Sequence, residues 1–218
     1  MKNADHPFRF VTVSYLTRIG NQTARTLPEL LDGLEECSDA SIFYHTFQTL
    51  GRHHFLTEGF SNDFAQWVLA ALNLPALAEQ LTALDIRGYL ALTDLRNDLL
   101  RIAHDFSRSH AAEAERAAFE PFHFCESVEV TVPVPWEAWT LEEFRHWLEH
   151  LTTSSFHYHF LSSRLRLGLR TNDFSQWFAN ELGLPELAKR TNQVDVYTNT
   201  IEGARAQLYK FIDMELAA

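Results

Sequence analysis

Two segments of the chain repeat one pattern of residues that could do chemistry: a serine, a Tyr-His pair and an arginine. These residues are Ser41, Tyr44, His45 and Arg52 in the first segment and Ser155, Tyr158, His159 and Arg166 in the second. On a helix, each serine, histidine and arginine would share one face, because residues four and seven positions apart are neighbours there. Arginine with histidine suits an anion such as a carboxylate or a phosphate. Both segments are therefore candidate ligand-binding sites.

The two histidines can equally be core residues. Buried polar groups need hydrogen-bond partners, and Asp85 and Asp195 are candidate partners for His45 and His159. Repetition of the pattern suits either interpretation. We favour the structural one, in which each histidine is largely buried and hydrogen-bonded within its own unit.

Two Asn-Asp pairs, at 62–63 and 172–173, resemble acid–base or metal-binding sequences. Each aspartate is followed three residues later by a glutamine, Gln66 or Gln176. An aspartate followed at that distance by glutamine is typical of a helix N-terminus. We therefore predict that Asp63 and Asp173 are N-caps rather than catalytic groups.

A metal site is the remaining chemical hypothesis. His146 and His150 are four residues apart, which is a ligand spacing on a helix. They lie opposite the apolar positions of that helix, and no third histidine or cysteine is fixed beside them. The usual nucleotide-binding, serine-hydrolase and paired-cysteine motifs are absent. We therefore expect no metal, no cofactor and no assembled catalytic centre.

Composition narrows the function classes. The chain has 218 residues, of which 46% are hydrophobic and 22% charged, which is ordinary for a packed protein. Its net charge of -11 disfavours a nucleic-acid partner, which normally requires a basic face. No apolar run is long enough for a membrane span, and no secretory signal region is evident. Two cysteines make no disulfide framework, so we expect a cytoplasmic location.

The elements that must position these residues occur twice. An offset of 114 residues aligns 7–47 with 121–161, and an offset of 110 aligns NDFAQW at 62–67 with NDFSQW at 172–177. The alternating valines at 128, 130 and 132 predict a strand at the start of a repeat. Capping boxes at Thr26 and Thr140 predict the first helix of each copy. Further helices are expected over 40–52 and 154–166, from 63 and 173, after Leu-Pro at 74–75 and 184–185, and over 93–104 and 200–213.

We therefore predict a predominantly helical α+β fold. It is a tandem duplication of a strand-plus-four-or-five-helix unit with approximate twofold symmetry. The first unit covers 1–110, a helical connector 111–120, and the second unit 121–218.

With these motifs in view, the chain resembles the bacterial family of unknown function numbered 5752. The resemblance rests on SIFYH and SFHYH, on the two NDF-containing hexapeptides, and on TLPELL and TLEEFR. It covers about 7–213 and implies no activity or catalytic residues.

The sequence favours a cytoplasmic, non-catalytic binding or regulatory protein, as a monomer or homodimer. One alternative is an enzyme or sensor for a small anionic or sugar ligand, bound by the Tyr/His/Arg positions named above. Another is an acidic scaffold that pairs with another protein. Neither the ligand nor the partner follows from the residues.

Overall fold

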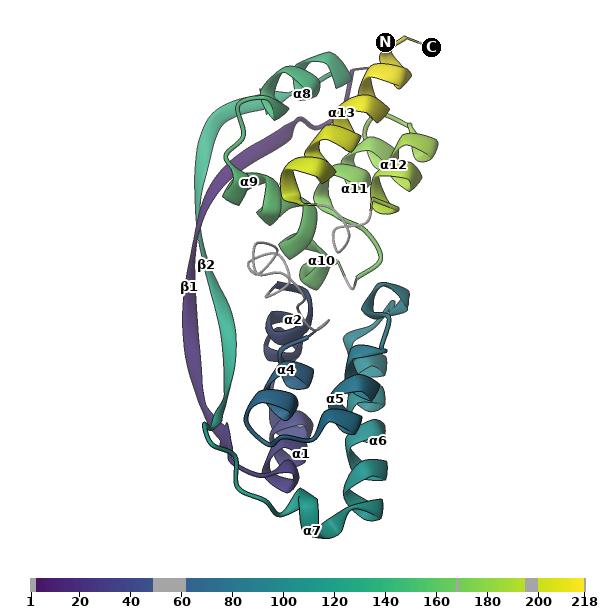
Figure 1. Ribbon diagram of the computed structural model, residues 1–218. Helices are drawn as coiled ribbons and strands as arrows, with labels where there is room; N and C mark the ends of the chain where they lie inside the picture. Colours follow the sequence, from purple (N-terminus) through teal and green to yellow (C-terminus); the bar gives the residue numbers. More distant parts are fainter. Residues whose placement is uncertain (1–2, 49–61, 168, 195–199, 218) are drawn as a thin grey trace. The chain divides into compact units, whose positions relative to one another are not determined.

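Each repeat opens with a strand far longer than the valine pattern predicts. Strands β1 (Phe8–Ala24) and β2 (Phe122–Ala138) each have 17 residues. They pair in an antiparallel two-stranded sheet (Figure 1). Their phenylalanines, valines and threonines favour extended backbone. Pro133 and Pro135 are tolerated in β2 because each strand of a two-stranded sheet has an unpaired edge.

This computed structural model describes residues 3–48, 62–167, 169–194 and 200–217. The chain divides into two compact units. Unit 2 is Leu16–Val128, and unit 1 combines Met1–Tyr15 with Glu129–Ala218. Both strands therefore contribute residues to both units. No helix among the described residues is long and apolar enough to cross a bilayer.

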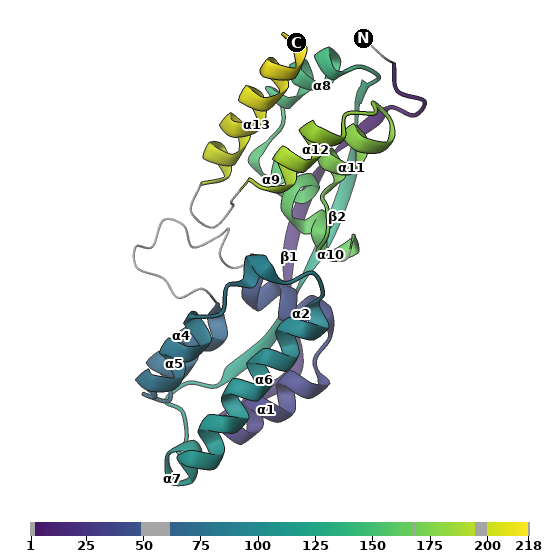
Figure 2. The ribbon, with the colours of Figure 1, turned by 90° about the vertical axis from the view of Figure 1, so that its right-hand side faces the viewer.

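Unit 2 contains the helices of the first repeat, and α6 packs against α1, α2 and α5 (Figure 2). Its helices, including the π-helical turn η1 and the 3-10 turn η2, are α1 (Leu27–Glu36), α2 (Asp39–Phe43), η1 (Tyr44–Gln48), α4 (Asp63–Ala70), α5 (Pro75–Thr82), η2 (Ile86–Gly88), α6 (Leu92–Ser109) and α7 (Ala111–Ala114). Pro75 stands in the first turn of α5, where its missing N–H costs nothing.

Unit 1 contains the helices of the second repeat in a similar order. They are α8 (Leu141–Leu148), α9 (Thr153–His157), the π-helical η3 (Tyr158–Ser162), α10 (Ser163–Arg166), α11 (Asp173–Asn180), α12 (Pro185–Asn192) and α13 (Ile201–Leu216). Here α13 packs against α8, α9 and α12 (Figure 1). The helix expected over 154–166 is thus interrupted by a π-helical turn.

The capping predictions are partly correct. Thr26 accepts a hydrogen bond from the backbone N–H of Glu29 at 3.3 Å, as the capping box predicts. Thr140 does the same with Glu143 at 3.2 Å.

The N-cap assignment of Asp63 and Asp173 is wrong, because the preceding asparagines fill that position. The Asn62 side-chain oxygen accepts from the N–H of Ala65 at 2.8 Å. Its amide group also donates to the carbonyl of Leu81 at 3.0 Å. Asn62 is buried, and a neutral amide satisfies both contacts without burying a charge. Asn172 caps α11 in the same way.

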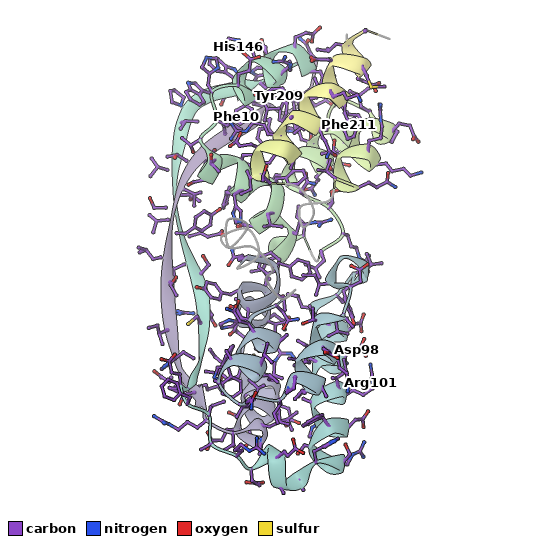
Figure 3. All side chains as sticks on the ribbon, viewed as in Figure 1. Phe10, Asp98, Arg101, His146, Tyr209 and Phe211 are labelled. Carbon is purple, nitrogen blue, oxygen red and sulfur yellow. The ribbon has the colours of Figure 1, made fainter. Side chains whose placement is uncertain are left out.

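The core of each unit combines helices of one repeat with strand residues of the other. In unit 1, Phe8 of β1 packs edge-on against Phe144 and Trp177, with ring centroids 5.3 and 5.8 Å away. Phe10 points from β1 into the same helices (Figure 3). In unit 2, the ring centroid of Phe122 in β2 lies 5.2 Å from that of Phe64. The predicted boundaries at 110 and 121 separate the two sequence repeats. The compact units differ from the repeats, because each unit contains a strand segment of the other repeat.

Candidate functional site

The candidate histidines are buried, as the structural interpretation predicts. His45 lies in η1 and His159 in η3, and each is 4% exposed. Both stand in π-helical turns, a local geometry that recurs at functional positions in proteins. Each repeat therefore positions its histidine in the same kind of backbone turn.

Both ring nitrogens of each histidine are engaged. His45 Nε2 accepts the backbone N–H of Cys125 at 2.9 Å, and Nδ1 lies 2.9 Å from Asp63 Oδ2. Because a backbone N–H can only donate, Nε2 carries no proton, and Nδ1–H donates to the carboxylate. His159 repeats the arrangement, accepting the N–H of Val11 at 3.2 Å and contacting Asp173 at 2.9 Å.

These contacts complete the open edges of the two-stranded sheet. The N–H groups of Val11 and Cys125 bond to the histidines, so they face away from the partner strand. Ser155 also donates to the carbonyl of Val11. Side chains from the helices thus make hydrogen bonds that a third strand would otherwise make, because buried backbone groups must be paired.

The prediction that each histidine is hydrogen-bonded within its own unit is only partly correct, because one ring nitrogen contacts an aspartate of the same repeat while the other accepts a backbone N–H from the other repeat. The aspartates also differ from the predicted ones. Asp63 and Asp173, rather than Asp85 and Asp195, hold the rings, and Asp195 lies outside the described residues. Arg52 also lies outside them, as does the side chain of Arg166 at the end of α10. The buried Tyr44 hydroxyl lies 3.3 Å from Thr17 Oγ1. The contribution of Tyr44, Arg52, Tyr158 and Arg166 to an anion site stays a prediction.

A pocket opens beside each His–Asp pair. We call the one in unit 1 the Trp177 pocket, with a volume of about 400 Å³, and the one in unit 2 the Trp67 pocket, with about 290 Å³. Each pocket is lined by five residues that align between the two repeats. They are Pro7, Phe8, Asp173, Gln176 and Trp177 in the first, and Pro121, Phe122, Asp63, Gln66 and Trp67 in the second.

Each tryptophan is fixed by a hydrogen bond from its indole N–H to the backbone. Trp177 donates to the carbonyl of His6 at 2.9 Å, and Trp67 donates to that of Glu120 at 2.8 Å. The segment preceding each strand is therefore held against α11 or α4. These hydrogen bonds fix the position of one tryptophan in each pocket.

The remaining lining differs between the pockets. The Trp177 pocket adds His6, Arg9, His159, Asn180 and Glu181. The Trp67 pocket instead has Ala70 and Ala71 at the helix, with Phe119 and Glu120 from the connector. The second repeat thus carries the more polar pocket.

A third cavity, of about 430 Å³, lies elsewhere in unit 2, between β1, β2 and the start of α2. There the Glu126 carboxylate accepts hydrogen bonds from Ser38 and Arg18, which lower the pKa of Glu126. Cys37 also lines this cavity, and burial raises the pKa of its thiol. The reactive thiolate is therefore disfavoured.

Sequence reasoning missed the pockets because their residues also have structural explanations. Trp67 and Trp177 match a core position, and Gln66 and Gln176 match a capping position. The available signal was the recurrence of both within one hexapeptide in both repeats. In the described parts of the chain, no three histidine, cysteine, aspartate or glutamate residues form a metal cluster.

Comparisons with known proteins agree with this fold. Residues 5–213 match a family described as a family of unknown function, DUF5752. The chain is also similar to the structure of OrfY from Thermoproteus tenax, with 29% identity and a TM-score of 0.83. That similarity covers 100% of this chain and 99% of the other. No curated protein matches significantly.

Proposed function

Because this chain belongs to DUF5752, a family of unknown function, its role must be argued from its own pockets, and we propose that it is a non-catalytic binding or regulatory protein whose Trp67 and Trp177 pockets hold small ligands. The observation that carries the proposal is the formation of one pocket twice from equivalent residues. Their volumes lie near the lower end of those typical of small-molecule sites.

The engaged histidines support a binding role over catalysis. A general base needs a nitrogen within reach of the substrate proton. His45 and His159 present none, because one nitrogen bonds the strand and the other bonds the aspartate. Each pocket therefore offers an aspartate, a glutamine and a tryptophan as recognition groups.

We further propose that the two repeats descend from a tandem duplication and are related by an approximate twofold axis. The equivalent order of helices and the equivalent histidine contacts support this origin. Superposition of the two repeats in an experimental structure tests it. Two free cysteines, Cys37 and Cys125, favour a reducing compartment, and we propose the cytoplasm.

The binding proposal is tested with protein in which every tryptophan carries a fluorine at ring position 5. Trp67 and Trp177 report on their own pockets, and Trp139, which lines neither, is the internal control. We expect compounds from a charge-balanced small-molecule collection to shift the fluorine resonance of Trp67 or Trp177 saturably. If millimolar compounds of every charge class leave both resonances in place, the pockets are not ligand sites.

A further inference from the structure

We propose that the Trp67 pocket selects small organic cations that carry an apolar body. This inference rests on the proposed binding function and names its ligand class. It follows from the charge that His45 leaves on Asp63, from the other charged group at this pocket, and from its aromatic wall.

The first step is the charge of the His–Asp pair. Because His45 Nε2 accepts a backbone N–H, the ring is neutral and cannot cancel the charge of Asp63. Only Oδ2 of Asp63 contacts the ring, and Asp63 lines the Trp67 pocket. The pair therefore presents a full negative charge beside the cavity.

The second step is the charge of the remaining lining. Glu120 adds a second carboxylate to the Trp67 pocket, and none of the described residues that line this pocket is basic. An anion would meet two like charges here, whereas an ammonium group would meet two opposite ones. The charge of this pocket thus selects for cations.

The third step is the aromatic wall of the Trp67 pocket. Trp67 and Phe122 meet edge-on with centroids 5.7 Å apart. Phe119 also lines this pocket although the residue is 87% exposed, and its backbone N–H donates to the carbonyl of Ala71 at 3.0 Å. A ligand with an apolar body would cover this ring, and aromatic faces attract cations.

The test uses benzyltrimethylammonium as the cation, benzyl alcohol as the neutral analogue and phenylacetate as the anion, with the fluorotryptophan protein. We expect benzyltrimethylammonium to shift the Trp67 resonance saturably and phenylacetate to leave it unchanged. Glu120→Gln should weaken the cation about tenfold, because it removes a charge next to the ligand. Phe119→Ala should weaken binding at Trp67 and leave Trp177 unaffected.

Glu115→Gln is the matched control, since Glu115 is exposed on the same connector and lines neither pocket. A circular dichroism spectrum and a urea unfolding midpoint that match those of the wild type verify that each variant is folded. Equal binding of benzyl alcohol or phenylacetate at Trp67 would overturn the cation class and leave the binding function standing. Failure of all three probes at both tryptophans, together with failure of the wider collection, would overturn the binding function itself.

Discussion

At the scale of single residues, His45 and His159 act as fixed acceptors for a strand of the other repeat. Each joins a helical turn, a strand N–H and an aspartate through one ring. Removing such a ring takes a hydrogen-bond partner from a buried backbone N–H and from a partly buried carboxylate at the same time. These residues should therefore govern stability rather than turnover.

His45→Ala should lower the free energy of unfolding by about 1–3 kcal/mol, the usual cost of leaving a buried polar partner unsatisfied. Urea denaturation measures the change. His123→Ala is the control, because His123 is exposed on the same strand as Cys125. Equal stability of the two variants would show that His45 holds nothing in place.

Asn172→Ala should cost about 0.5–2 kcal/mol through loss of the α11 N-cap. The Asn172 side chain accepts the N–H of Ser175 at 2.9 Å and donates to Asn192 at 3.0 Å. Thermal unfolding measures the loss, with the exposed Asn180→Ala at the far end of the same helix as control. A Tm drop that is no larger for Asn172→Ala would contradict the cap assignment.

At the scale of elements, the strands carry the aromatic residues that close each helical core. Phe124 of β2 is 2% exposed and packs beside Phe122, with centroids 5.0 Å apart. Phe124→Ala should destabilise the protein by about 3–5 kcal/mol, as for other buried phenylalanines. Chemical denaturation gives the value, and His123→Ala on the opposite face should change it little. A small loss for Phe124→Ala would mean that β2 does not belong to the core of unit 2.

Glu126 links β2 to β1 and to the N-cap of α2, and this contact predicts a pH dependence. Hydrogen bonds from Ser38 and Arg18 lower the pKa of Glu126. A depressed pKa in the folded state contributes stability above the unfolded value of about 4.3, and this is lost as the pH falls through the folded pKa. Glu126→Gln should therefore lower Tm near neutral pH and flatten its decline below about pH 4.3. Tm profiles from pH 3 to 7 measure this, with Glu115→Gln expected to keep the wild-type slope.

At the scale of the whole molecule, the exchange of strands decides which pieces of the chain can fold. A fragment of residues 16–128 contains all of unit 2, including Phe122, Phe124 and the Cys125 N–H. A fragment of residues 1–118 follows the repeat instead and lacks all three. We expect the first to fold as a monomer, and the second to unfold or to pair with another copy.

Circular dichroism and light scattering after gel filtration distinguish these fragments. Both contain the same helices from α1 to α7, so a difference between them isolates the contribution of the strands. If residues 1–118 form a monomer as stable as residues 16–128, the strand of the other repeat is dispensable.

The sequence by itself determined the features that depend on residues a few positions apart. The Thr26 and Thr140 caps and the proline-started α5 and α12 follow from contacts within one helical turn. The repeat pattern also predicted a predominantly helical α+β chain. Burial of His45 and His159 was the favoured of two interpretations, and the structure confirms it.

Only the tertiary structure decided which partners meet across the chain. His45 and the Cys125 N–H are 80 residues apart, and no local pattern encodes their contact. Asn62 and Asp63 have similar capping propensities, and the buried Leu81 carbonyl selected the asparagine. Asp63, which does not cap the helix, instead contacts the His45 ring and lines the Trp67 pocket. Long-range burial thus chose among residues that short-range propensity treats as equivalent.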